Sequence, residues 1–498
     1  PEYSMEKQEV VIEEKADGEN EGALQFELRR EVGTTNWVAA DTHIHTLSLS
    51  KHGDALLQER MVTLAGEGIE MAIATEHNLH ASYAEAAREV GVEKFFTVVP
   101  GNEVTTKRGH FNVFPVSTGA PPADFNVVDW PQLIPAIRRS GGARGGMEQP
   151  VVILNHPTDT HAGFTPFAKT NFNRLTGKNL AGKFENDFEA MEVINSGAMR
   201  TDWMEPFECW FTLLNRGLKV TGVAASDSHD VSRFIVGQGR TYIRGADTNA
   251  GALKVRELTE NLREGRAVFG LGLFAQLSIS DAPDALDRPS LTTGVVAAGA
   301  SGPGDLHKGE SRFFEVTASV DFPTWMNAEG PTVLTLYENG AAKVRFPFEM
   351  RKRAGRPLAF KARFPKLKGD AWYVVVAETP GVTNAYWSVA RPYQPSGPEW
   401  HPQMIGATNP VYVDGDGNGF YTSPRKTAQV LCESYASPHD LIPALGDYGR
   451  GTALQVAEIL HEAGIDLAAN EFAPAFGRAA PFVKEAVRDY LGSVARGK

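Results

Sequence analysis

The sequence predicts an α/β fold, followed by an all-β domain and a helical segment at the C-terminal end. Between residues 37 and 280, short runs rich in Val, Ile and Phe alternate with stretches whose apolar residues recur at helical spacing. From about residue 285 onward, β-type runs follow one another without helices, and residues 426–498 return to helical spacing. Strands that alternate with helices favour a largely parallel sheet.

The helices and strands expected in the first half of the chain support this prediction. We expect helices over residues 56–64, 83–90, 130–137, 207–214 and 253–262, and a glycine follows each of them, as is typical of helix ends. The expected strands are residues 37–40, 69–74, 95–99, 111–116, 151–154, 190–194 and 220–225. Seven strand-helix steps are too many for a small sheet, so we predict a barrel.

The second half predicts a β-sandwich-like domain and then helices. Expected strands are residues 313–320, 332–337, 342–348, 358–364, 372–376 and 386–390, separated by turn signals such as Asn339-Gly340. Residues 1–22 are polar, acidic and without periodicity, which predicts a mobile terminus. The predicted division is an N-terminal tail and lead-in strand (1–36), the barrel (37–280), the β-sandwich-like domain (281–425) and a helical C-terminal segment (426–498).

The amino-acid composition limits the kinds of partner that the protein is expected to bind. The 498 residues carry a formal net charge of -12, which argues against nucleic-acid binding, because that draws its affinity from Lys and Arg. No apolar run is long enough to span a bilayer, so we expect a soluble chain that acts on a small molecule, without a membrane or nucleic-acid partner. Homo-oligomerisation and localisation are left open. The chain begins with Pro1 rather than Met, which is compatible with a removed leader and a periplasmic or secreted origin.

Histidines and carboxylates gather directly after the expected strands. They form six short clusters in the first half of the chain: Asp41, His43 and His45; His52 and Asp54; Glu76 and His77; Glu103 and His110; Asn155 and His156; Asp227 and His229. Loops at the carboxyl ends of barrel strands converge on one face, so these side chains are expected to meet. Burying an unpaired charge is expensive, and a metal ion removes that cost. Nitrogen and oxygen ligands without Cys suit zinc, manganese or iron.

Other histidines and motifs have a plainer interpretation. We interpret His80, His161, His307, His401, His439 and His461 as surface or hydrogen-bonded core residues, and Glu76 as an acid that orients His77. The run from Asp414 to Gly419 matches the opening of a calcium loop, but its twelfth position is Arg425, so we predict a tight turn. The glycine-rich stretch 141–146 is interpreted as a connector, because it does not complete a phosphate-binding motif.

The order of these clusters resembles the PHP family, named for polymerase and histidinol phosphatase domains. The segment from Trp37 to His43, the His52-Gly53-Asp54 turn and the tail motif from Thr408 to Val413 look most similar to its carbaryl-hydrolase-like subfamily. The resemblance implies a distorted (β/α)7 barrel with two or three divalent ions at the carboxyl ends of its strands. It also implies the metal ligands His43, His45, His77, Glu103, His110, His156, Asp227 and His229, with either His52 or Asp54 at the remaining position.

The chemistry expected of such a site is hydrolysis. A hydroxide bridging the ions would attack a phosphoryl, carbamoyl or acyl centre, with Asp227 as both metal ligand and proton acceptor. Phosphoester hydrolysis of a small molecule is the first expectation. Carbamate, ester or amide hydrolysis is the alternative that the closer subfamily suggests, and Arg200, Arg233 and Arg240 lie in loops where they could bind phosphate. A binding protein with a vestigial metal site is the non-catalytic alternative.

Overall fold

The computed structural model describes residues 1–10, 24–142, 149–159, 164–181, 187–282, 288–294, 299–326, 330–353, 355–382, 387–393 and 397–495. Over these residues the protein is a mixed α/β molecule with several sheets. None of the helices in the described ranges is long and apolar enough to cross a membrane. The N-terminal tail predicted to be mobile lies partly outside the described residues, as do His161 and most of the glycine-rich stretch.

The strands of the first half fall into two sheets. They are β1 (Trp37–Asp41), β2 (Met71–Ala74), β3 (Thr97–Pro100), β4 (Asn102–Thr106), β5 (Gly109–Phe114), β6 (Val151–Leu154), β7 (Ala190–Asn195), β8 (Thr221–Ala225), β9 (Gly239–Arg244) and β10 (Ala267–Leu271). One sheet runs β10-β9-β1-β2-β3 and the other β4-β5-β6-β7-β8. Pairing is parallel within β1-β2-β3 and β6-β7-β8, and antiparallel elsewhere, so the sheets are less parallel than predicted.

Strand pairing does not close these two sheets into a barrel within the described residues. Side chains bridge the gap beside β8 instead. The Asn409 carboxamide accepts from the Gly222 N–H at 2.7 Å and donates to the carbonyls of Gly222 and Ala267, at 2.9 and 3.0 Å. Thr241 Oγ1 on β9 both accepts from and donates to the backbone of Ala224. These bonds satisfy backbone groups of β8 that a neighbouring strand would otherwise pair.

Helices connect several of these strands. They are α1 (Leu47–Ser50), α2 (Leu57–Gly66), α3 (Ala84–Glu89), α4 (Trp130–Ser140), α5 (Glu205–Arg216) and α6 (Val255–Arg263). The helix ends agree with the sequence signals, because Gly217 adopts φ 94° directly after α5, where a residue without Cβ is least strained.

The second half contributes two sheets packed face to face. Its strands are β11 (Phe274–Asp281), β12 (Ser290–Leu291), β13 (Leu306–His307), β14 (Phe313–Asp321), β15 (Thr332–Glu338), β16 (Ala341–Phe348), β17 (Leu358–Pro365), β18 (Ala371–Pro380), β19 (Gln403–Thr408) and β20 (Val411–Val413). Strands β11-β14-β17-β12 form one antiparallel sheet. The others continue the sheet of β10, because β19 pairs with β10 along four residues. The predicted boundary at residue 281 thus lies where both sides share one sheet.

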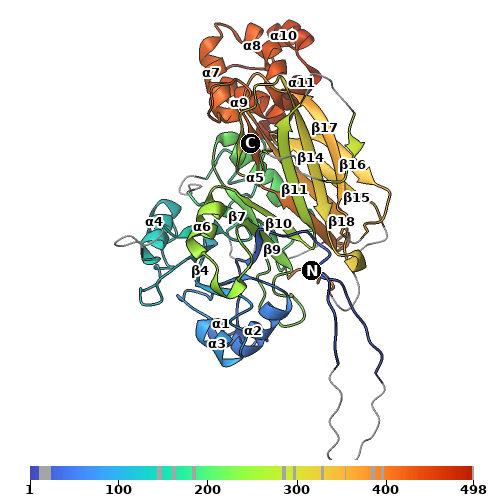
Figure 1. The fold of residues 1–498 in the computed structure, drawn as a ribbon. Coiled ribbons are helices and arrows are strands. Elements are labelled where there is room, and N and C mark those ends of the chain that lie inside the picture. The colour runs from blue at the N-terminus through green and yellow to red at the C-terminus, as the bar shows by residue number, and fades with distance from the viewer. Residues whose placement is uncertain are drawn as a thin grey trace, which may run out of the picture.

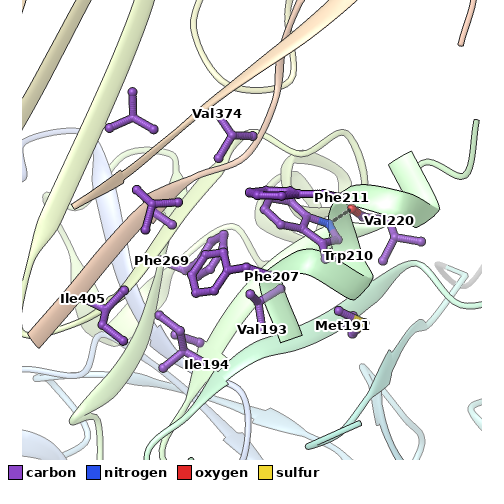
Figure 2. Close-up of a cluster of buried hydrophobic side chains, with 14 of the residues drawn as sticks. Met191, Val193, Ile194, Phe207, Trp210, Phe211, Val220, Phe269, Val374 and Ile405 are labelled. Atoms are coloured by element: carbon purple, nitrogen blue, oxygen red, sulfur yellow. Dashed lines mark hydrogen bonds between the residues drawn. The ribbon is translucent and has the colours of Figure 1, made fainter. Parts of the chain in front are cut away.

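One hydrophobic core joins the two halves. Figure 2 shows Trp210 and Phe207 of α5 beside Phe269 of β10, with Val374 of β18 and Ile405 of β19 close by. Trp210 is fully buried, and its indole N–H donates to the carbonyl of Val220 at 2.8 Å. A buried aromatic side chain of this size contributes roughly 3 kcal/mol or more, so the shared core holds the two halves together.

The C-terminal helices form a separate core. They are α7 (Pro424–Ser434), α8 (Pro438–Ala444), α9 (Gly449–Glu462), α10 (Ala473–Arg478) and α11 (Pro481–Ala495). Short 3-10 turns lie at Ala250–Ala252, Thr324–Met326, Leu445–Asp447 and Asn470–Phe472. Figure 1 shows this helical group at one end of the molecule, away from α1, α2 and α3.

Three local predictions are wrong. No strand begins the chain in the described part of residues 1–36, where an isolated bridge joins Tyr3 and Arg30. Glu2 is buried and pairs with Arg240 at 2.9 Å, so the first residues of the tail are anchored. The expected strand at 386–390 is absent from its described residues, 387–390.

Candidate metal centre

The site begins where the strands of both first-half sheets end. His43 and His45 follow β1, His77 follows β2, His156 follows β6, and Asp227 follows β8. Asp227 adopts φ 52° and His156 φ 22°, a left-handed backbone that non-glycine residues rarely hold. Such strain is concentrated at functional positions.

The predicted ligands meet in one buried cluster. Three groups each bring their ligand atoms within 4.8 Å of one another: His43, Glu103 and His156; His43, His45 and Asp227; His45, His77 and His229. Because His43 and His45 are shared between groups, the three sets are contiguous. The structure thus brings these residues together as the sequence predicted, and their role as metal ligands stays a prediction.

Glu103 lies between the groups. Its Oε1 is 3.4 Å from His43 Nε2 and 3.1 Å from His110 Nδ1, while its Oε2 is 2.5 Å from His77 Nδ1. The two oxygens thus face different histidines, as a bridging carboxylate would. His110 reaches the cluster because the chain turns tightly between β4 and β5, which pairs it with Thr105.

Of His52 and Asp54, it is His52 whose side chain reaches the histidine cluster. His52 Nε2 is 2.9 Å from His77 Nε2, and the His52 ring stacks on that of His229 with centroids 4.3 Å apart. The Asp54 carboxylate instead accepts a hydrogen bond from the Val231 N–H at 2.7 Å.

In each of three histidines, Nδ1 contacts a polar atom, while Nε2 forms no hydrogen bond with the described residues. His43 Nδ1 lies 2.7 Å from Glu192, His45 Nδ1 lies 3.1 Å from Ser50 Oγ, and His229 Nδ1 lies 3.0 Å from the Asp227 carbonyl. The Nε2 atoms of all three are buried without a hydrogen-bond partner in the described structure. An outer contact of this kind fixes the tautomer and leaves Nε2 free to bind a metal ion. The donor set therefore fits divalent ions.

Glu76 orients His45 rather than His77. Its carboxylate accepts from the hydroxyls of Ser50, at 2.5 Å, and of Thr46 and Tyr83. Ser50 in turn contacts His45, so Glu76 acts through that hydroxyl. The predicted outer role is found, but on a different histidine.

The ionisable side chains of the cluster shift one another's pKa strongly. Burial alone would lower the pKa of His43, but Asp227, Glu192 and Glu103 raise it well above its usual value. Burial and the neighbouring His229 together lower the pKa of His45 well below its usual value. Although burial opposes it, His77 and His110 lower the pKa of Glu103 well below its usual range. The carboxylates thus remain ionised among histidines that cannot all carry protons, and a divalent cation can take the place of those protons.

Sequence reasoning missed several contributors. Glu192 sits within the apolar strand β7 and accepts from the His156 backbone N–H and from Asn195, at 2.7 and 2.8 Å. A carboxylate inside a buried strand is itself a signal, because it needs partners there. Asp159 lies 3.3 Å from His156 Nδ1.

Tyr393 enters the site from the second half of the chain. Its hydroxyl donates to Asp227 Oδ2 at 3.2 Å, and its backbone N–H donates to the Gly197 carbonyl. No local sequence signal marks this residue.

The expected phosphate-binding arginines are dispersed. Arg240 is buried against Glu2, and Arg233 is exposed over the ring of Phe234. Arg200 donates to the Thr158 carbonyl and lines a small cavity together with His156.

Comparisons with solved structures include a distant structural likeness. Neither the family models nor the curated proteins include a match to this chain. A crystal structure from Bacteroides vulgatus, described as a two-domain protein containing a predicted PHP-like metal-dependent phosphoesterase, shares 14% sequence identity. The match covers 77% of this chain and 100% of that one, with a TM-score of 0.37. A TM-score of this size does not establish a common fold.

Proposed function

We propose that this protein is a metal-dependent hydrolase of the PHP type that cleaves a phosphoester of a small molecule. The observation that carries the proposal is the buried cluster in which the Nε2 atoms of His43, His45 and His229 form no hydrogen bond within the described ranges, while those of His43 and His45 lie 3.3 and 3.4 Å from Asp227 Oδ1. A purely structural histidine cluster would not leave these nitrogens without a hydrogen bond, because buried polar groups are normally hydrogen-bonded.

The residues present fit two or three divalent ions, with zinc, manganese and iron as the candidates for this nitrogen and oxygen donor set. His43, His45, His77, Glu103, His156, Asp227 and His229 would hold them, with His52 and His110 at the edge. When bound, the ions would supply an activated water at neutral pH and positive charge against the charge that develops during hydrolysis.

Asp227 has two distinct sides that suit a dual role. Its Oδ1 is 3.3 Å from His43 Nε2 and 3.4 Å from His45 Nε2, on the side of the metal ligands. Its Oδ2 accepts from Tyr393 and from Asn195, which fix the orientation of the carboxylate. We assign Oδ1 to metal binding, and the same carboxylate, held in place through Oδ2, to accepting the proton of the attacking water.

A carbamate, ester or amide is the second candidate substrate. The observation that favours it is the placement of Arg240, which is buried against Glu2 and so cannot bind phosphate at the cluster. Arg200 is then the arginine best placed for a phosphate, because it lines the same small cavity as His156.

The test couples metal analysis to a substrate panel. The purified full chain is measured for zinc, manganese and iron, and then assayed with aryl phosphoesters, aryl carbamates and aryl esters before and after chelation. We expect bound metal, turnover of at least one phosphoester, and loss of turnover with the chelator that added metal restores. Replacing Arg200 with Ala should raise KM for phosphoesters and leave KM for neutral esters unchanged.

Other outcomes reject parts of the proposal. Turnover confined to carbamates or esters would replace the first candidate by the second. A chain that holds no transition metal and hydrolyses nothing after metal addition would favour a binding protein with a vestigial site. Full activity in Asp227→Asn with retained metal would remove the proton-accepting role of Asp227.

A further inference from the structure

A cavity of about 300 Å³ lies at the opposite end of β8 from the histidine cluster. Val220 and Thr221, at the start of β8, line it together with the end of α6 and the segment after β20. Asp227 follows the other end of β8, so at ~3.3 Å per residue the two sites are separated by up to about 20 Å. We propose that this cavity is a second binding site, for a small organic anion that carries a planar ring.

The charge of the cavity points to an anion. Lys219, Arg263 and Lys308 line it, and Glu264 is the carboxylate among its lining residues. In the described part of the chain, none of the three cations has a carboxylate within ion-pair distance. A positive cavity in a chain of net charge -12 is a local exception that an anionic ligand would neutralise.

Two of the lining residues, Arg263 and Tyr421, each carry a buried donor atom that forms no hydrogen bond in the part of the chain that the structure describes. The Arg263 Nη2 atom and the Tyr421 hydroxyl are both inaccessible to solvent, and neither forms a hydrogen bond within the described residues. Buried polar groups are rarely left in this state. Both groups donate hydrogen bonds, so a carboxylate or phosphonate oxygen in the cavity would give them a partner once the two side chains turn toward it.

An exposed aromatic ring completes the site. Phe420 is 76% exposed, and the Lys308 ammonium lies 6.0 Å from the centroid of its ring. The turn before it is well ordered by hydrogen bonds, because Asp414 accepts from the N–H groups of Gly417 and Gly419, at 2.7 and 2.8 Å. A large apolar ring held at a cavity rim offers a stacking surface for a planar group.

The site is tested with three ring-bearing anions and two partial probes. Binding of 1-naphthoate, indole-3-carboxylate and phenylphosphonate to the full chain is measured by titration calorimetry. The neutral 1-naphthamide and inorganic phosphate supply the ring and the anion separately. We expect at least one ring-bearing anion to bind at least tenfold more tightly than either partial probe, and to do so equally well after chelation, because the histidine cluster is not involved.

Variants place the binding at the cavity. Lys308→Gln and Phe420→Ala change exposed side chains and should each weaken binding about tenfold with no change in Tm. Lys94→Gln and Phe95→Ala are the matched controls, because Lys94 lies 5.0 Å from the ring of Phe95 elsewhere on the surface. Tyr421→Phe removes only the partnerless hydroxyl, so it should weaken binding severalfold without lowering Tm.

Three results would overturn the proposal. The first is an absence of saturable binding below millimolar concentration for all three ring-bearing anions. The second is binding of 1-naphthamide or inorganic phosphate as tight as that of the ring-bearing anions. The third is binding that survives in Lys308→Gln and Phe420→Ala, or that disappears with chelation.

Discussion

Glu192→Gln should weaken metal binding, lower Tm, or do both. In the protein, one carboxylate oxygen of Glu192 accepts from His43 Nδ1, and the other accepts from the His156 N–H and from Asn195. An amide has one acceptor oxygen, so it cannot serve both sides. If its NH₂ faces His43, that ring must place its proton on Nε2, the atom that faces the cluster.

The expected losses of metal affinity and of stability follow from these contacts. Loss of an outer contact to a metal-binding histidine reduces metal affinity by about 10- to 100-fold, or ~1.4–2.8 kcal/mol at 25 °C. If the amide turns the other way, two buried donors lose their acceptor, and the free energy of unfolding falls by about 1–3 kcal/mol for each donor left unsatisfied. We therefore expect a weaker metal complex, a lower Tm, or both.

The assay is competition for zinc or manganese against a chromophoric chelator, with Tm recorded with and without metal. Glu189→Gln is the matched control, because Glu189 lies three residues earlier and its carboxylate accepts from Arg138 and from the Val152 N–H, away from the cluster. A Glu192→Gln protein that binds metal as tightly as the unmodified chain, with unchanged Tm, would refute this reasoning.

Three further perturbations test other parts of the structure. Tyr393→Phe removes one hydrogen bond to Asp227, and we expect kcat to fall about tenfold with metal content and Tm unchanged, so an unchanged kcat would exclude Tyr393 as a positioning residue. Burial raises the pKa of Glu70 to about 7 from 4.5, so its neutral form stabilises the fold at pH 4.5 and below, and that contribution is lost as the pH rises through 7. In urea unfolding, the free energy of unfolding of Glu70→Gln relative to that of the unmodified chain should therefore rise by about 1–3 kcal/mol between pH 5 and pH 8, after allowance for the partial exposure of Glu70. Parallel pH profiles of the two proteins would contradict this. Asn409→Ala should lower the free energy of unfolding by about 2–4 kcal/mol in the same experiment, because backbone groups of Gly222 and Ala267 lose their partner, and a loss below 1 kcal/mol would show that water replaces the carboxamide.

The strand-end residues were predictable because their signal is local. His43, His77 and His156 each follow an apolar run, and the end of that run marks the end of the strand. The prediction that they converge needed only the rule that loops at one end of a sheet meet. Strand β4 escaped prediction because Asn102–Thr106 is polar on the side that faces the cluster.

The remaining features depend on contacts far apart in sequence. Tyr393 lies 166 residues from Asp227, and nothing in its own neighbourhood indicates that contact. The bridging of the two sheets by Asn409 and Thr241 was equally hidden, because a side chain that substitutes for a strand partner leaves no periodic pattern. The strand-helix alternation and the PHP resemblance both predicted a barrel, whereas the pairing of the described strands does not close one.

The pairing of β10 with β19 limits how this protein can be divided or recombined. A chain ended near residue 280 would expose the edge of β10, uncover Phe269 and lose Asn409 from beside β8. Such a fragment would present an unpaired edge and an apolar face at once, which favours aggregation. Gene fusions and exchanges between related chains should therefore succeed only when the half that holds the histidine cluster and the β-rich half are inherited together.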